Sequence, residues 1–318
     1  MGACAFDSFL SQISDLSFAQ CTRVLSLLKE AVGKARAAAI IEAAVAHKLS
    51  CPLCRGTRLY RHGQANGLQR FRCRGCGRTF NALTGTPLAR LRHKAKWLDY
   101  LDNLLASRSV RKAAQTIEVA KNTSMRWRHR FLHTTKADRP ACLSGIAEAD
   151  ETFLLESRKG ARKMDRPARK RGGKASKRGI SSEQVCILVT RDRSGKTCDF
   201  VTGLGPVTKA QLHLHLPPVL AADTLLVTDA NQAYRAFARE ARISHAFVNL
   251  RTGERVNGAI HVQNVNSYHS RFHDWLRPFR GVATHYLPNY LGWRWAIDQQ
   301  RIDSPETLLK AAIGVFNS

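Results

Sequence analysis

The pattern of apolar and polar positions changes near residue 140 and predicts a helical first part followed by alternating strands and helices. Residues 1–47 carry apolar residues at helical spacing, which predicts two or three amphipathic helices that serve packing or interaction. One stripe holds Phe9, Leu10, Ile13 and Leu16, and another holds Val24, Leu25, Leu27 and Leu28.

Residues 94–132 have the pattern of a helix-turn-helix. After a helix over 94–105, Ser109 can cap a second helix, and Asn122 or Thr123 can cap a third. The third helix carries three arginines, as does a recognition helix in a DNA major groove: Arg126, Arg128 and Arg130. Glu118 stands where a turn glycine is common, and an ordinary basic helical hairpin is the alternative.

Beyond Pro140, apolar runs bounded by turn residues predict five strands and three helices. We expect strands at 146–153, 184–191, 197–201, 224–229 and 245–250, and helices near 207–220, 231–241 and 264–279. Three strands followed by helix, strand, helix, strand and helix is the order of a ribonuclease H-like fold. The fold class is therefore a mixed α and β multidomain chain that ends in a ribonuclease H-like catalytic domain.

The same patterns suggest the domain organisation. We expect a helical region at 1–47, a zinc ribbon at 48–90, a helix-turn-helix region at 91–140, a catalytic domain at 141–300 with a basic insertion at 156–183, and a tail at 301–318.

Charge is the unusual feature of the composition. The chain has 318 residues, with 51 Lys and Arg against 24 Asp and Glu, so its net charge of +27 predicts a polyanionic partner, with nucleic acid as the first candidate. Residues 48–140 hold 21 basic and 4 acidic residues, and 158–178 hold 11 basic residues against Asp165, whereas 1–47 hold four of each sign. The charge therefore predicts two separate basic surfaces.

Apolar runs and the first residues bear on the location of the protein. The sequence has no apolar run near the roughly 20 residues that span a bilayer and begins without a basic signal-peptide region. We expect a soluble cytoplasmic protein associated with the nucleoid.

Four of the nine cysteines form two C-x2-C pairs separated by 18 residues: Cys51, Cys54, Cys73 and Cys76. This spacing predicts one structural Zn²⁺ ion, with a redox dithiol or chance as the alternatives. Arg70, Arg72 and Arg74 lie beside the second pair and are candidate phosphate contacts. The other five cysteines have the surroundings of buried free thiols.

Two acids occupy matching places in the predicted sheet. Asp150 lies on its first strand and Asp229 ends its fourth, so the two carboxylates would meet near the sheet centre. Adjacent carboxylates repel each other unless a cation lies between them, and Mg²⁺ prefers such oxygen ligands. Two such ions can activate the attacking oxygen and stabilise the leaving oxygen of a phosphodiester.

An ordered series of motifs resembles bacterial insertion-sequence transposases of the ISXO-like family, over roughly residues 48–295. The series is the paired cysteines, the arginine-rich helix-turn-helix, Glu148-Ala-Asp150-Glu-Thr, Val227-Thr-Asp229, Val265-Asn266-Ser-Tyr-His269 and the segment 280–293. The resemblance implies cleavage and strand transfer at terminal inverted repeats by two aspartates and a third residue, Glu or Asn. It places Asn266 at the third position and assigns Glu148 no metal role.

Asn266 departs from the commoner Asp-Asp-Glu arrangement. An amide oxygen can bind Mg²⁺ but is uncharged, so we expect weaker metal affinity. A helix N-cap is the alternative role of Asn266. His269 lies one helical turn further on and can contact the scissile phosphate, with packing or solvent exposure as its alternative.

The insertion between the first two strands is too polar to pack, and it can bind the DNA backbone through Arg169, Lys170, Arg171 and Lys174. We predict a DNA transposase that acts on element ends and target DNA with two catalytic Mg²⁺ ions, for which Mn²⁺ can substitute. We expect a homodimer or higher oligomer on DNA. The alternatives are a non-catalytic DNA-binding regulator and a nuclease of the same fold.

Overall fold

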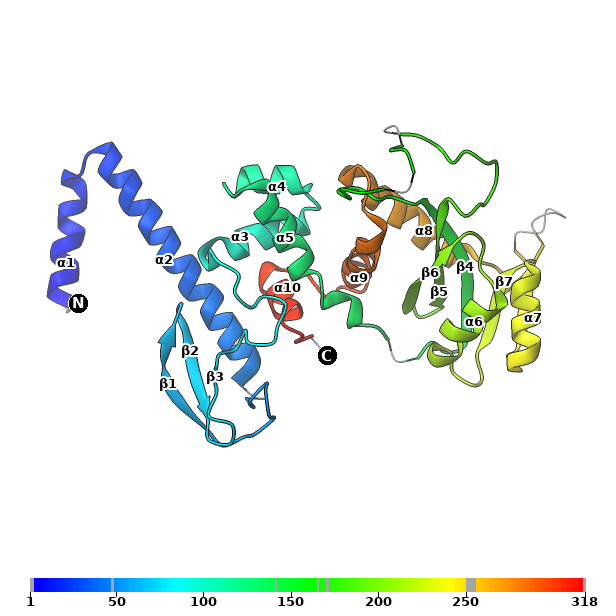
Figure 1. Ribbon diagram of the computed structural model, residues 1–318, viewed down its shortest axis with the longest axis horizontal. Helices are drawn as coiled ribbons and strands as arrows, with labels where there is room; N and C mark the ends of the chain where they lie inside the picture. Colours follow the sequence, from blue (N-terminus) through cyan, green and yellow to red (C-terminus); the bar gives the residue numbers. More distant parts are fainter. Residues whose placement is uncertain are drawn as a thin grey trace.

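The computed structural model describes residues 3–46, 49–140, 142–164, 166–169, 172–249 and 256–316. Three parts follow one another along the molecule (Figure 1): an N-terminal helical arm, a middle part with a small sheet beside a group of helices, and a larger sheet with its own helices.

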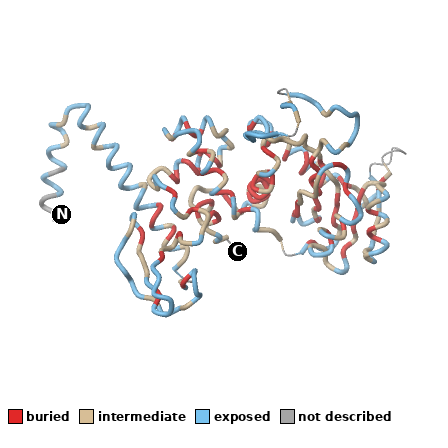
Figure 2. Tube along the Cα trace, in the orientation of Figure 1, coloured by how far each residue is buried: buried red, intermediate tan, exposed pale blue. Residues whose placement is uncertain are grey.

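The arm consists of α1 (Ala3–Ser11), a 3-10 turn (Gln12–Asp15) and the first half of α2 (Phe18–Val45). Ser17 and Gln20 form a capping box that begins α2. Only the second half of α2 contacts the body, where Gly33 allows close approach: a Cβ there would lie 2.4 Å from the carbonyl oxygen of Ala95. The first half of α2 and the described part of α1 are largely exposed (Figure 2).

The small sheet has the antiparallel order β1-β2-β3 and follows the first cysteine pair. Its strands are β1 (Leu59–Ala65), β2 (Leu68–Cys73) and β3 (Thr79–Phe80). Asn66 and Gly67 both have positive φ, 55° and 76°, as a tight hairpin turn requires. The sheet is joined to α2 by a hydrogen bond of 2.6 Å from the Gln69 amide to Glu42 Oε1.

The helix-turn-helix comprises α3 (Trp97–Leu105), α4 (Val110–Thr116) and α5 (Lys121–Phe131), after a 3-10 turn over Lys94–Lys96. The Ser109 cap is confirmed, because its side chain accepts from the Lys112 amide. The caps expected at Asn122 or Thr123 are wrong, because α5 already begins after Ala120. Glu118 takes the left-handed conformation that glycine would otherwise supply, with φ 53°.

The large sheet has five strands in the order β6-β5-β4-β7-β8. They are β4 (Ile146–Leu155), β5 (Gln184–Asp192), β6 (Thr197–Leu204), β7 (Leu225–Asp229) and β8 (His245–Val248). The first three strands pair antiparallel, and β4, β7 and β8 pair parallel. This topology confirms the ribonuclease H-like fold and the strands expected from the sequence.

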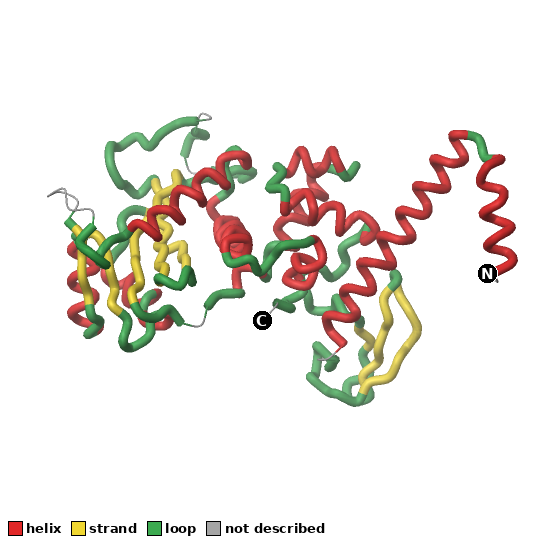
Figure 3. The backbone as a smooth tube through the Cα atoms, turned by 180° about the vertical axis from the view of Figure 1, so that it is seen from behind, coloured by secondary structure: helices red, strands yellow, loops and turns green. Residues whose placement is uncertain are grey.

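Helices cover both faces of this sheet (Figure 3). One face packs on α6 (Lys209–His215) and α7 (Gln232–Ala241), with Leu188, Leu212 and Phe237 in its core. The other packs on α8 (Gln263–Leu276) and α9 (Leu287–Asp298), with Val189 and Val265 in its core. Short 3-10 turns lie at Thr135–Ala137, Pro217–Val219, Arg277–Phe279 and Thr284–Tyr286.

The end of the chain returns to the helix-turn-helix. The expected tail contains α10 (Pro305–Ala312), which packs against α2, α3 and α5. On α9, a Cβ at Gly292 would lie 2.6 Å from the backbone of Lys136, so the two segments touch directly. One buried apolar cluster therefore joins Trp97 of α3, Trp293 of α9 and Val265 of α8. Within the described ranges, no helix is both long and apolar enough to span a membrane.

Candidate functional site

Asp150 and Asp229 occupy neighbouring strands at equivalent positions. In the parallel pair of β4 and β7, Glu148 lies opposite Val227, and two further residues on each strand lead to Asp150 and Asp229. Adjacent strands lie about 4.8 Å apart, and equal steps keep both side chains on one face. The Asp229 carboxylate also accepts from the Asn231 amide at 3.0 Å, which fixes its orientation at the strand end.

Alternate residues of β4 face α8 at three successive levels. At the first level, Glu148 accepts hydrogen bonds from the start of α8. At the third, Thr152 Oγ1 lies 2.6 Å from His273 Nε2. At the middle level, Asp150 Oδ2 lies 3.9 Å from His269 Nδ1, which is too long for a hydrogen bond. The hydrogen bonds of Glu148 and Thr152 therefore hold β4 and α8 together, while Asp150 and His269, which lie between them, make no hydrogen bond to each other.

Electrostatic effects single out the same place. Burial raises the pKa of Asp150 to about 6, the Glu151 amide opposes this, and the charge of Asp229 adds to it. Burial also raises the pKa of Glu151 to about 7, against the hydrogen bond from Tyr234 and with the charges of Asp150 and Asp229. Partly buried carboxylates thus act on one another's pKa at this place, and a cation beside Asp150 and Asp229 would favour their charged forms.

Glu151 lies on the opposite face of β4 from α8, and sequence reasoning gave it no role. Its carboxylate accepts a hydrogen bond from the Tyr234 hydroxyl of α7. The available signal was strand alternation, which places Glu151 on the face of β4 opposite to Asp150, where an acid against a helix requires a polar partner.

His269 is a neutral imidazole at pH 7. Burial lowers its pKa to about 4, with a further contribution from His273. Its Nε2 atom is buried and has no hydrogen-bond partner among the described residues. The ring nitrogen nearer to Asp150 is Nδ1, and a ligand or an ordered water would satisfy the buried Nε2.

Asn266 lies one helical turn before His269 on α8, so the two share a face of the helix. The alternative role as an N-cap is wrong, because Val262 is the N-cap and the Asn266 amide donates to the Val262 carbonyl at 3.1 Å. Its half-buried side chain is therefore not needed to begin the helix.

Glu148 fixes the start of α8. Its fully buried carboxylate accepts from the backbone amides of Asn264 and Val265, at 2.8 and 3.0 Å, and from the Asn264 side chain at 2.8 Å. Arg193 completes the group with an ion pair of 2.7 Å. These contacts occupy both carboxylate oxygens of Glu148 and fix the position of α8 relative to Asp150.

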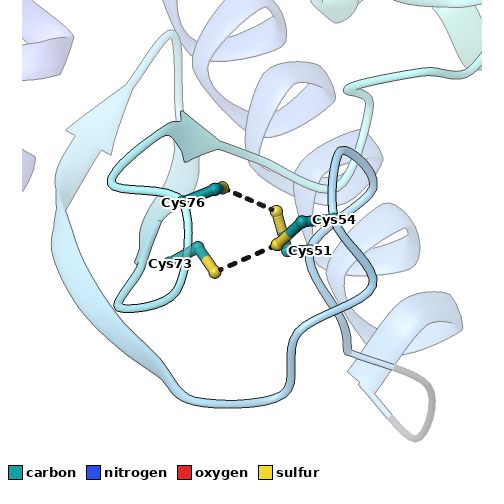
Figure 4. Close-up of side chains that lie close together, drawn as sticks. All are labelled: Cys51, Cys54, Cys73 and Cys76. Atoms are coloured by element: carbon teal, nitrogen blue, oxygen red, sulfur yellow. Dashed lines mark hydrogen bonds between the residues drawn. The ribbon is translucent and has the colours of Figure 1, made fainter.

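The four cysteines predicted to bind zinc lie together (Figure 4). Cys51 and Cys76 have their sulfurs 3.6 Å apart, as do Cys54 and Cys73, and all four sulfurs lie within 4.8 Å of one another. Tetrahedral Zn²⁺ with bonds of about 2.3 Å places its sulfurs about 3.8 Å apart, so the cluster fits this ion. The backbone amides of Cys76 and Gly75 help to lower the pKa of Cys73 to about 7, which favours the thiolate that zinc binds.

The predicted DNA contacts divide by exposure. Arg70 and Arg72 lie on β2, and Arg74 follows its last residue. Arg72 and Arg74 are exposed and Arg70 is half-buried. On α5, Arg126 and Arg130 are exposed and line an open depression of about 600 Å³. The other residues that line it are Asn122, Met125, His129, His133, Tyr286 and Asn289.

Arg128 does not fit the DNA contact expected of it. Its side chain is 1% exposed and lies over the rings of Phe279 and Trp293, and it donates to the Arg108 carbonyl. It joins the helix-turn-helix to the catalytic part. The helical pattern alone could not separate it from Arg126 and Arg130, because the buried face of α5 depends on α9.

In the basic insertion, Arg169 pairs with Glu183 at 3.2 Å, and Arg166 pairs with Glu156 at 3.1 Å. Lys174 is exposed. Lys170 and Arg171 lie outside the described residues.

Comparison with known proteins gives the family. Residues 142–295 match the model of the ISXO2-like transposase domain, and residues 43–77 match that of the InsA N-terminal domain, a zinc ribbon. Over 247 residues the chain is 33% identical to a protein of the transposable element ISH50 from Halobacterium salinarum, covering 76% of this chain and 82% of that protein. The chain belongs to the insertion-sequence transposases of the ISXO2-like family.

Two further matches are shorter or more distant. Over 80 residues the transposase is 38% identical to the InsA protein of the insertion element iso-IS1N from Shigella dysenteriae, covering 24% of this chain and 84% of that protein. A chain of the pre-cleavage Mos1 transpososome aligns with 13% identity and a TM-score of 0.27, over 67% of this chain and 73% of that chain. The strand order, and not this distant likeness, establishes the fold of the transposase.

Proposed function

We propose that this transposase binds the ends of its element through the ribbon and α5, and cuts and joins DNA at Asp150, Asp229 and Asn266. Three observations carry the proposal. Asp150 on β4 faces His269 on α8 without a hydrogen bond, Asp229 occupies the equivalent position on the adjacent strand, and His269 Nε2 has no hydrogen-bond partner among the described residues. Such a group needs a ligand to satisfy it.

The donor set fits Mg²⁺ or Mn²⁺. Asp150 and Asp229 supply carboxylate oxygens, and Asn266 supplies an uncharged amide oxygen from the same side of α8 as His269. When bound, divalent ions polarise the phosphodiester and activate an attacking oxygen, which is water for cleavage and a 3′-hydroxyl for joining.

The protein residues position the reaction. Asp150 in the middle of β4 and Asp229 at the end of β7 hold negative charge on rigid strands, and Glu148 holds α8 in place beside them. His269, neutral at pH 7, can donate a hydrogen bond to a phosphate oxygen from one ring nitrogen and accept one at the other. The chain itself forms no covalent bond to DNA in this scheme.

Binding DNA is supported by the placement of exposed arginines on β2 and α5 and by the net charge of +27. The cysteine cluster supports a single structural zinc that holds the ribbon in shape. Because an element has two ends and each chain has one candidate site, we expect a homodimer or higher oligomer on DNA. Association with the nucleoid would follow from this binding.

The test uses labelled duplexes that carry an element end, with Mg²⁺ or Mn²⁺. We expect the wild-type protein to nick the duplex and Asp150→Asn to bind it equally well but not cut it. Asp274→Asn is the matched control, since Asp274 is an exposed acid on α8 paired with Arg277. Binding without cleavage by the wild type would indicate a regulator, and cleavage by Asp150→Asn would refute the site.

A second variant tests the third ligand. Replacing Asn266 by Glu supplies a charged oxygen at the same position, so we expect cleavage to be retained at lower Mg²⁺ concentration. An unchanged metal requirement would argue against Asn266 as a ligand.

A further inference from the structure

The N-terminal arm, residues 3–32, forms no part of the zinc ribbon or the carboxylate site. It extends away from the body in Figures 1 and 2, and the described residues of α2 that are fully buried begin only at Ala37. Seven of the large apolar residues that the structure leaves exposed lie on it: Phe6, Leu10, Phe18, Leu25, Leu27, Leu28 and Val32.

Apolar or small residues recur along α2 with alternating steps of three and four. The series is Phe18, Cys21, Leu25, Leu28, Val32, Ala35 and Ala39. A 3.5-residue period is the sequence pattern of a two-stranded coiled coil, in which every second member of the series occupies the same heptad position. We call this series the α2 seam.

The α2 seam faces solvent. Phe18 is 89% exposed and Val32 is 63% exposed, while Leu25 and Leu28 are each about half exposed. The residues with which α2 contacts the body lie on the opposite side of the helix, as Gly33, Ala37 and Ile41 show. The helix therefore has two apolar stripes, and only one of them has a partner within the described residues.

Charge indicates what the α2 seam binds. Residues 1–47 hold four basic and four acidic residues, in a chain whose net charge is +27. An apolar surface of this kind is not suited to DNA phosphates, and the balance of charge in this region means that two copies of it do not repel each other.

We propose that the α2 seam pairs with the α2 seam of a second copy of this chain, forming a two-stranded coiled coil in the absence of DNA. Pairing would bury the exposed leucines and hold two catalytic domains in one particle before an element end is bound. The proposal is independent of whether the carboxylate site cuts DNA.

The experiment measures the molecular mass of the purified, nuclease-treated protein by light scattering at micromolar concentration and high salt. High salt screens charge and removes residual DNA, while apolar pairing persists. We expect the mass of two chains for the wild type. Leu25→Glu with Leu28→Glu should give the mass of one chain and raise the dissociation constant roughly 100-fold or more.

Leu27→Glu is the matched control. Leu27 is 58% exposed on the same turns of α2 but lies outside the seam, so this variant should keep the mass of two chains. Zinc content and circular dichroism report whether each variant is folded. If the double variant unfolds, Val32→Glu replaces it, because Val32 is a single exposed seam position.

Three results would overturn the proposal. The first is a wild-type protein with the mass of one chain, which would show that the α2 seam does not pair with a second copy. The arm would then pack within its own chain or bind a different protein. The second is a seam variant, folded, that keeps the mass of two chains. The third is equal loss of pairing in Leu27→Glu and the seam variant, which would indicate general apolar association instead of a coiled coil.

Discussion

The cysteine cluster and the carboxylate site are both suited to metal ions, but they are built in different ways. All four thiols come from residues 51–76, and their sulfurs already lie at distances that suit Zn²⁺. The carboxylate site draws on β4, β7 and α8, from Asp150 to Asn266, and its central groups do not bond to each other. A local site is set by its own turns, whereas a dispersed site depends on contacts elsewhere that hold its elements in place.

Removing a carboxylate should have the largest effect. We expect Asp229→Asn to lower cleavage on the order of 1,000-fold or more, because the cation loses a charged ligand. Zinc content and end binding should not change, since the ribbon and α5 lie apart from this site. Gel assays of cleavage and binding on the same duplex would check both. Equal loss of both activities would show that the two sites are not separate.

Removing a thiol should instead impair the binding of zinc and of the element end. Cys73→Ser takes a buried ligand from the cluster, so we expect zinc to be lost and the ribbon strands to unfold. End binding should weaken by about 100-fold, because ribbon arginines lose their positions. Cys142→Ser, at an exposed thiol outside the cluster, is the control. Full zinc content in Cys73→Ser would contradict the assignment.

Glu148 tests whether the dispersed site depends on its supports. Glu148→Gln keeps the shape but removes the charge that binds two backbone amides and Arg193. We expect the free energy of unfolding to fall by about 1–3 kcal/mol and cleavage by about 10–100-fold, with more Mg²⁺ needed for half-maximal rate.

The shifted Mg²⁺ requirement separates positioning of α8 from loss of stability alone. Glu240→Gln is the control, since Glu240 is an exposed acid on α7 paired with Lys209. If Glu148→Gln loses stability while its Mg²⁺ requirement stays that of the wild type, Glu148 does not position the site.

The pH dependence of stability should be the smallest effect. Burial raises the pKa of Asp150 from 3.8 to about 6 and that of Glu151 from 4.5 to about 7, so between about pH 4 and 7 these two groups hold more protons in the folded chain than in the unfolded chain. Buried histidines with lowered pKa, such as His129 and His269, act in the opposite direction, so the test is the difference between the wild type and Asp150→Asn. Without Mg²⁺, Asp150→Asn should be more stable than the wild type at pH 7 by about 1–2 kcal/mol, and this difference should shrink as pH falls toward 4. Thermal unfolding of both proteins across this range measures the difference, and a difference that does not change with pH would contradict the electrostatics.

The sequence predicted the elements of the fold because their signals are local. Alternating apolar residues located β4, and the C-x2-C spacing located the four cysteines. What it missed depends on packing between distant segments. Arg128 is buried by Phe279 and Trp293, more than 140 positions away. Glu148 supports α8 through Asn264, and no spacing rule connects these two residues.

The role of Asn266 shows the same limit. The sequence allowed either an N-cap or a ligand, and the structure removes the first by placing Val262 at the cap. The helix boundary that decides this depends on Glu148, which supplies the hydrogen bonds that an N-cap side chain would otherwise make.

Iron-mediated cleavage of the polypeptide tests the central claim most directly, namely that three distant residues form one metal site. With added hydrogen peroxide and ascorbate, Fe²⁺ that replaces Mg²⁺ reduces the peroxide to hydroxide and a hydroxyl radical, and ascorbate reduces the resulting Fe³⁺ again. The radical cuts the backbone near the ion. We predict cuts close to Asp150, Asp229 and Asn266 in the same protein, each suppressed by excess Mg²⁺ and lost in Asp150→Asn. Cuts at only one of the three segments, or cuts that persist in Asp150→Asn, would contradict the account.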